Sequence, residues 1–185
     1  MYAAWGGHMP VVDRLLERGA DPSAADKGGG TALMRAAVGG HLPVVDWLLE
    51  RGADPSATDK RGRTALKSAA GGGHLPVVDR LLERGADPSA ADKGGRTALM
   101  LTAVGGHLPV VERLLERGAD PSAADEDGST ALMLAAQGGH LPVVERLLER
   151  RADPSAADKN GGTALMRAAR GGHLPVAERL QTAIA

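Results

Sequence analysis

Apolar residues recur along the chain in two alternating short patterns. Within residues 26–58, Leu33 begins an i, i+3, i+4 series of apolar residues, and Val44 begins a second apolar face that ends at Leu49. Such spacing places apolar side chains on one side of a helix. The pattern therefore predicts two helices of roughly eight residues each, well below the ~12–15 residues at which an isolated helix is marginally stable. We expect these helices to depend on stacking against others.

Residues that start and stop helices stand at the ends of both patterns. Thr31 is suited to an N-cap, and Pro43 falls in the first turn of the second helix, where a missing N–H costs nothing. Gly52 supplies the left-handed residue that closes this helix. Before Thr31, the run Asp26-Lys27-Gly28-Gly29-Gly30 has the composition of a turn and predicts a hairpin tip.

This segment repeats with a period of 33 residues, which places a histidine at 8, 41, 74, 107, 140 and 173. A unit of this length cannot bury its own apolar face, so the period predicts a stack of repeats with one continuous core. We expect a single domain over 1–185, with a partial first repeat at 1–25, full repeats at 26–58, 59–91, 92–124 and 125–157, and a C-terminal repeat at 158–185.

Four motifs recur in each period: Asp-x-x-Gly-x-Thr-Ala-Leu, Ala-Ala-x-x-Gly-His, Val-Val-x-x-Leu-Leu and Gly-Ala-Asp. Together they resemble the ankyrin repeat over essentially the whole chain. The resemblance implies an all-α repeat solenoid, an ankyrin-type stack of helix-turn-helix units with β-hairpin or turn fingers. It also implies that hairpins and first helices line a concave face, which in this family usually binds proteins, and that second helices form the convex back.

The chain departs from the family pattern at several positions. Met34 stands where the family has histidine, and Lys67 replaces methionine in the next repeat. Arg151 replaces the helix-ending glycine found at 19, 52, 85 and 118. A left-handed arginine costs roughly 1–2 kcal/mol, so this position is expected to be strained.

Composition narrows the classes of function. The chain has no cysteine, and its aromatic residues are Tyr2, Trp5 and Trp47, so alanine, valine and leucine must form the core. No basic-then-apolar leader and no apolar run of 18 residues is present. We therefore expect no membrane partner and a cytoplasmic or otherwise intracellular location.

The histidine series does not indicate a metal site. Packed helices lie ~8–10 Å apart, whereas zinc–ligand bonds are ~2 Å, so histidines one repeat apart cannot share an ion. We expect them to brace loops instead. A catalytic triad would occur in five or six equivalent copies, and no Walker loop, HExxH or nucleophile elbow is present. The sequence thus predicts no enzyme activity, no metal and no cofactor.

Positions that differ between repeats are the candidates for partner contact. By the resemblance, the variable hairpin and first-helix positions line the concave face, where eleven basic residues oppose Glu126 and Asp127. The basic residues are Lys27, Arg35, Lys60, Arg61, Arg63, Lys67, Lys93, Arg96, Lys159, Arg167 and Arg170. The formal net charge of −1 therefore conceals a basic groove, which would steer acidic segments toward it.

The predicted partner-binding site comprises these basic side chains except Arg170, the two acidic side chains, an apolar floor and two aromatic anchors. The floor is formed by Met100, Leu101, Met133 and Leu134, and the anchors are Tyr2 and Trp5. The sequence thus favours a monomeric, non-catalytic scaffold that binds a protein or peptide, with an acidic segment preferred.

Several alternatives remain open at this point. The basic residues are also explained as ordinary exposed side chains that keep the surface soluble. Tyr2 and Trp5 are also explained as residues that cover the exposed flank of a truncated first repeat. The chain is also consistent with an engineered or structural scaffold without a native ligand, or with a spacer that self-associates end to end. Nucleic-acid binding is disfavoured, because the hairpins lack aromatic residues and Glu126 and Asp127 interrupt the basic stripe.

Overall fold

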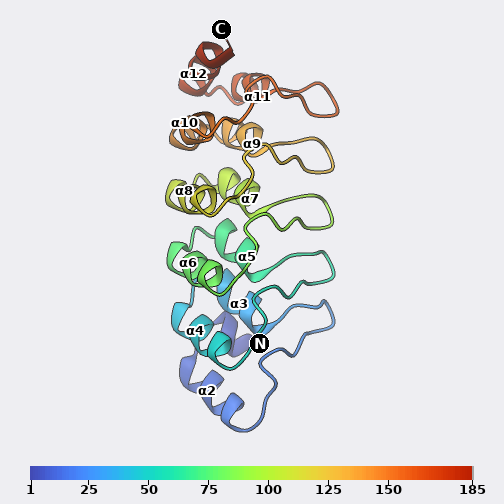
Figure 1. Cartoon of the computed structure of the whole chain (residues 1–185), viewed down its shortest axis with the longest axis vertical. Coiled ribbons are helices and arrows are strands. Elements are labelled where there is room, and N and C mark those ends of the chain that lie inside the picture. The colour runs from blue at the N-terminus through green and yellow to red at the C-terminus, as the bar shows by residue number, and fades with distance from the viewer. Residues whose placement is uncertain (185) are drawn as a thin grey trace. The chain divides into compact units, whose positions relative to one another are not determined.

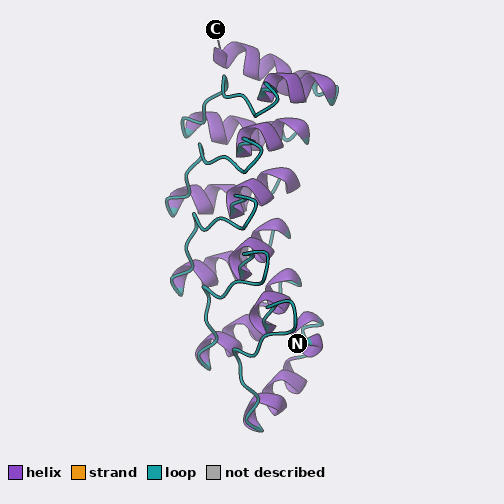
Figure 2. Cartoon of the chain, turned by 90° about the vertical axis from the view of Figure 1, so that its right-hand side faces the viewer, coloured by secondary structure: helices purple, strands orange, loops and turns teal. Residues whose placement is uncertain are grey.

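The structure is a computed structural model in which residues 1–184 are described. Helices alternate with loops throughout these residues, as Figure 2 shows. The chain divides into two compact units, an N-terminal unit of Met1–Asp87 and a C-terminal unit that begins at Pro88.

Every repeat contributes a first helix and a second helix. The first helices are α1 (Tyr2–Trp5), α3 (Ala32–Val38), α5 (Ala65–Gly71), α7 (Ala98–Gly105), α9 (Ala131–Gln137) and α11 (Ala164–Arg170). The second helices are α2 (Met9–Glu17), α4 (Leu42–Glu50), α6 (Leu75–Glu83), α8 (Leu108–Glu116), α10 (Leu141–Glu149) and α12 (Leu174–Ile184).

Each helix packs against its counterpart in the neighbouring repeat. In the N-terminal unit α1, α3 and α5 pack in series, as do α2, α4 and α6. In the C-terminal unit the series are α7, α9, α11 and α8, α10, α12. The predicted fold class is confirmed, and the chain is an all-α repeat solenoid. The prediction of one domain stays a prediction.

Capping residues set the helix boundaries where the sequence predicted them. The Thr31 hydroxyl accepts a hydrogen bond from the Met34 N–H at 3.3 Å, and a threonine caps α5, α7, α9 and α11 in the same way. Pro43 lies in the first turn of α4. The hairpin preceding α3 is held by a single antiparallel bridge between Ala25 and Thr31, so it is a turn finger without a regular strand.

The core consists of the alanine, valine and leucine side chains that the apolar pattern predicted. Leu33 and Ala36 of α3 and Val44 and Leu48 of α4 are almost completely buried. Their counterparts in the inner repeats are buried to the same degree. This small-residue core allows the helices to pack closely, and neighbouring repeats provide the burial that a single repeat lacks.

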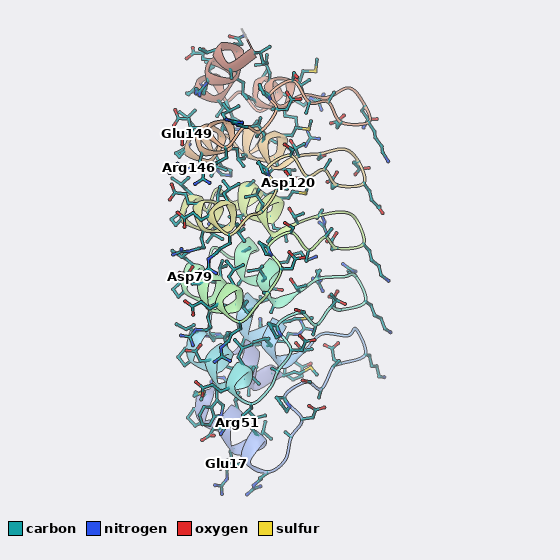
Figure 3. The ribbon with its side chains drawn as sticks, viewed as in Figure 1. Glu17, Arg51, Asp79, Asp120, Arg146 and Glu149 are labelled. Atoms are coloured by element: carbon teal, nitrogen blue, oxygen red, sulfur yellow. The ribbon has the colours of Figure 1, made fainter. Side chains whose placement is uncertain are left out.

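Ion pairs link successive second helices on the side away from the hairpins. Arg80 of α6 contacts Asp46 of α4 at 2.9 Å, and Arg146 of α10 makes the equivalent pair with Glu112 of α8. Arg146 also contacts Glu149 of its own helix at 2.8 Å, beside which it lies in Figure 3. Trp47 occupies this arginine position in α4, and there the Arg51 guanidinium lies 3.3 Å from the centre of its ring.

Arg151 adopts the left-handed conformation that the sequence predicted, with φ 65°. Among residues 1–184 it is the one residue other than glycine with positive φ. Replacing Arg151 by glycine is expected to raise the free energy of unfolding by about 1–2 kcal/mol, because glycine adopts this conformation without steric cost. Urea denaturation followed by circular dichroism measures the change.

Gly118 provides the reverse substitution at the equivalent position, with φ 88° and open space where the Cβ of a side chain would lie. Gly118→Arg should lower the unfolding free energy by a similar amount. An unchanged denaturation midpoint in both variants would contradict the assignment of strain to this position.

Candidate functional site

In each unit the hairpins project from the side on which the first helices lie, and the second helices lie opposite (Figure 1). We call this side the hairpin face. It consists of the hairpin tips and the exposed residues of the first helices. The tips are residues 27–30, 60–63, 93–96, 126–129 and 159–162. The predicted partner-binding residues come from these two kinds of segment.

One aspartate at the base of each hairpin holds its tip in shape. Asp59 Oδ1 accepts hydrogen bonds from the N–H groups of Arg61 at 2.8 Å and Arg63 at 3.0 Å. Asp26, Asp92, Asp125 and Asp158 make the same pair of bonds. Adjacent tips are also joined through the backbone, as by the Lys60 N–H to the Gly28 carbonyl at 2.9 Å. The fingers therefore present their outer side chains from an ordered frame.

The same aspartates pair with four of the predicted basic residues. The pairs are Arg35–Asp26 at 2.9 Å, Arg63–Asp59 at 2.7 Å, Arg96–Asp92 at 3.1 Å and Arg167–Asp158 at 2.7 Å. The charge count from the sequence set the eleven basic residues against Glu126 and Asp127 alone. Because four of the arginines also pair with these aspartates, the hairpin face is less basic than that count suggested.

These contacts hold the carboxylates in the charged form. The Arg35 guanidinium, with the N–H groups of Gly30 and Gly28, lowers the pKa of Asp26 below its ordinary value. Burial pushes the pKa of Asp92 upward, but hydrogen bonds from Arg96 and Gly94 outweigh it and the pKa is lowered. The pKa of Asp59 and that of Asp158 are lowered by equivalent bonds.

Acid is expected to destabilise the fold through these aspartates. A carboxyl group whose folded-state pKa is depressed stabilises the protein above the unfolded-state pKa of about 4, and this contribution is lost as the pH falls through the folded-state value. Urea midpoints should therefore drop progressively below about pH 5. Asp92→Asn, which removes one such carboxylate, should show a shallower drop, and an equally steep one would contradict this origin.

Three predicted contact residues lie inside the stack. Met100 and Met133 are each 1% exposed, and Lys67 at the equivalent position is 2% exposed, with its Nζ donating to the Gly62 carbonyl at 2.8 Å. The side chain at this position is therefore buried and not available to a partner. The prediction that these side chains form part of a surface for a partner is wrong.

The remaining predicted residues are accessible. Lys27, Lys60, Arg61, Lys93 and Lys159 are exposed at the tips, as are Glu126 and Asp127. Leu101 and Leu134 are half-buried on α7 and α9. Val38 and Val104, which the predicted site did not include, are exposed at the ends of α3 and α7. They were recognisable in the sequence as variable positions one turn beyond Met34 and Met100.

The N-terminal unit has two hollows on its hairpin face that share Asp26 and Arg35. The larger, about 360 Å³, is lined by Met1, Tyr2 and Trp5 in addition to that ion pair. The smaller, about 80 Å³, continues along α3 past Val38 to the Asp59–Arg63 pair and Ser68 of α5. Tyr2 is 91% exposed and Trp5 is 58% exposed, so they cover little of the flank of α1. Their rings instead border the larger hollow.

The repeated histidines brace the stack, as predicted. His41 Nε2 lies 2.9 Å from the Trp5 carbonyl, and His140 Nε2 lies 2.9 Å from the Val104 carbonyl. Each bond joins the start of a second helix to the end of the first helix one repeat earlier. Within the described residues, no three histidine, aspartate or glutamate side chains are grouped as a metal site would require.

None of the helices in residues 1–184 combines the length and the apolar composition needed to cross a bilayer.

Comparison with known proteins assigns the chain to a family. A comparison with curated proteins gave no match. The family model for ankyrin repeats, which describes several successive repeats, matches residues 1–92, 52–125 and 99–183. Ankyrin repeats are generally modules of protein–protein interaction, and the chain belongs to the ankyrin repeat family.

Proposed function

We propose that the chain is a non-catalytic scaffold that binds a protein or peptide on the hairpin face, with its main contact in the N-terminal unit. The observation that carries this proposal is the exposure of Tyr2, Trp5 and Val38 around the two adjoining hollows. Exposed aromatic residues beside a concavity are the usual anchors of protein interfaces, because they bury a large area at low cost in side-chain entropy.

The charged side chains at the hairpin tips favour a partner with an acidic segment. Lys27, Lys60 and Arg61 are exposed at the tips of the hairpins whose Asp26 and Asp59 line the smaller hollow, and within the described residues their side chains make no hydrogen bond or ion pair. Arg35 and Arg63, in contrast, already contact aspartates. An acidic segment of the partner would therefore meet the tip lysines and Arg61, while its apolar side chains would enter the hollow beside Trp5. The C-terminal unit offers secondary contacts of the same kind, namely Lys93, Lys159, Leu101 and Val104.

Selection from a random peptide library displayed on phage, with the immobilised chain as bait, supplies the ligands for a test. Tyr2→Ala combined with Trp5→Ala should weaken the selected peptides by about tenfold or more, as loss of interface anchors does. Both side chains are exposed, so the double variant should retain the helical circular dichroism of the parent. Binding is measured by fluorescence anisotropy at two salt concentrations.

Lys60→Glu with Arg61→Glu tests the contribution of charge. This variant should slow association with acidic peptides and reduce its salt dependence. Arg84→Glu is the control, because Arg84 is an exposed residue that follows α6 and belongs to neither the hairpin tips nor the first helices. Undiminished binding by both hairpin-face variants, or an equal loss in Arg84→Glu, would refute the proposed site.

A further inference from the structure

The second helix of the first repeat presents an apolar surface that other repeats bury. Val11 and Leu15 of α2 are 51% and 48% exposed. Val44 and Leu48, which are the same residues one repeat later in α4, are each 1% exposed. Both helices carry the same Val-Val and Leu-Leu pairs, so the exposure of Val11 and Leu15 reflects the neighbours of α2 and not its apolar pattern. We call the apolar surface of Val11 and Leu15 the leading face.

The last repeat exposes the complementary surface, which we call the trailing face. Met166 of α11 is 57% exposed, although the equivalent Met100 and Met133 are buried. Ala169 and Leu174 are exposed as well, whereas Ala136, the equivalent of Ala169, is completely buried. Inside each unit, residues of this kind are covered by the repeat that follows. Within the described residues nothing covers them here.

Charged residues on the two faces are also counterparts. Arg14 on the leading face corresponds to Arg80 and Arg146, which contact an acidic residue 34 positions earlier. Its side chain is 69% exposed and reaches Glu17 of its own helix at 3.8 Å. Glu178 on the trailing face is exposed and occupies the acidic position of this series. A trailing face placed against a leading face would therefore bring Glu178 to Arg14.

The histidine series points to the same juxtaposition. A histidine ring lies beside each of Gly7, Gly40, Gly106 and Gly139, always from the following repeat. Gly172 has the same backbone conformation, with φ 72°, yet open space lies beside it. His8 is exposed at the start of α2 and is the residue that would fill this space. Its Nε2 would then face the carbonyl of Arg170, as His173 Nε2 faces that of Gln137 at 3.0 Å.

We propose that a second copy of this chain docks head to tail, with its leading face on the trailing face of the first copy. Apolar, ionic and hydrogen-bonding groups are matched because the joint would reproduce a contact that each unit already makes between its own repeats. Such a contact uses two different surfaces of the molecule, so it propagates to longer assemblies as the concentration rises. The sequence favoured a monomer and left end-to-end self-association open as an alternative. The exposure of both faces supports that alternative.

The sedimentation coefficient of the full chain, measured from micromolar to near-millimolar concentration, tests this proposal. The coefficient should rise with concentration. Leu15→Glu places a charge in the centre of the leading face and should weaken the association by about tenfold or more, since it removes a buried leucine from the joint. Val104→Glu alters an equally exposed apolar residue of the hairpin face and should leave the association unchanged. A constant coefficient in the parent chain would overturn the proposal.

Charge reversal tests the orientation. Arg14→Glu and Glu178→Arg should each weaken self-association, because like charges then meet at the joint. Mixing the two variants lets the altered leading face of one meet the altered trailing face of the other with opposite charges, and should restore assembly. Restoration supports the head-to-tail contact. Association that is unaffected by either variant, or that is not restored by mixing, would exclude the Arg14–Glu178 register. Peptide binding to the hairpin face is read separately, so the two proposals fail independently.

Discussion

Replacement of Leu81 by alanine is expected to lower the free energy of unfolding by about 2–5 kcal/mol. Leu81 lies in α6, is completely buried and belongs to the surface through which α6 and α4 pack together. Removing its isobutyl group reduces the apolar area that is buried on folding and also leaves a cavity. The fold contains few large side chains that could move into that space, since its core is built of alanine, valine and leucine. Urea denaturation of the full chain measures the loss.

Leu15→Ala is the matched control, because Leu15 is the equivalent residue of α2 and is 48% exposed. Its loss should be less than half that of Leu81→Ala, since about half of its surface already faces solvent. The comparison is made at low concentration, where association between copies is negligible. Equal losses in the two variants would contradict the view that neighbouring repeats, rather than the helices themselves, supply most of the stability.

The helices and their caps could be predicted from the sequence because each is specified locally. Thr31, Pro43 and Gly52 act on backbone groups within one turn, and the apolar spacing around them fixes the face that is buried. Arg151 was predictable for the same reason, because its place in the repeat required a left-handed residue. Because the repeats are nearly identical in sequence, the interpretation of one repeat also applied to the others.

The candidate site was less predictable because it depends on side-chain direction and pairing. Met100, Met133 and Lys67 occupy a position that varies between repeats, which suggested contact with a partner, yet all three side chains are buried. Positions that differ between repeats therefore include buried positions that accept several side chains, as well as exposed positions. Asp59 and its equivalents do not vary, which assigned them to the frame, yet they neutralise arginines on the predicted binding face. A count of charges at the variable positions omitted these aspartates, because they belong to the part of the hairpin that is the same in every repeat.

Replacement of Gly139 by alanine is expected to lower the free energy of unfolding by about 2–5 kcal/mol, through two separate effects. Gly139 has φ 72°, a left-handed conformation that costs a residue with a Cβ about 1–2 kcal/mol. The new Cβ would also lie 2.5 Å from Nδ1 of His173, so the histidine would have to move. That movement would strain the bond from His173 Nε2 to the Gln137 carbonyl and loosen the contact between the last two repeats.

Gly172→Ala separates the two effects, because Gly172 has the same φ of 72° and no neighbouring atom within 4 Å of the new Cβ among the described residues. It should lose only the conformational part, about 1–2 kcal/mol. The excess loss in Gly139→Ala then measures how much the fold gains from close contact between a glycine and the histidine of the next repeat. Combining Gly139→Ala with His173→Ala should remove this excess, since the smaller side chain leaves room for the new methyl group. If the excess persists without the imidazole, the clash with His173 is not its cause.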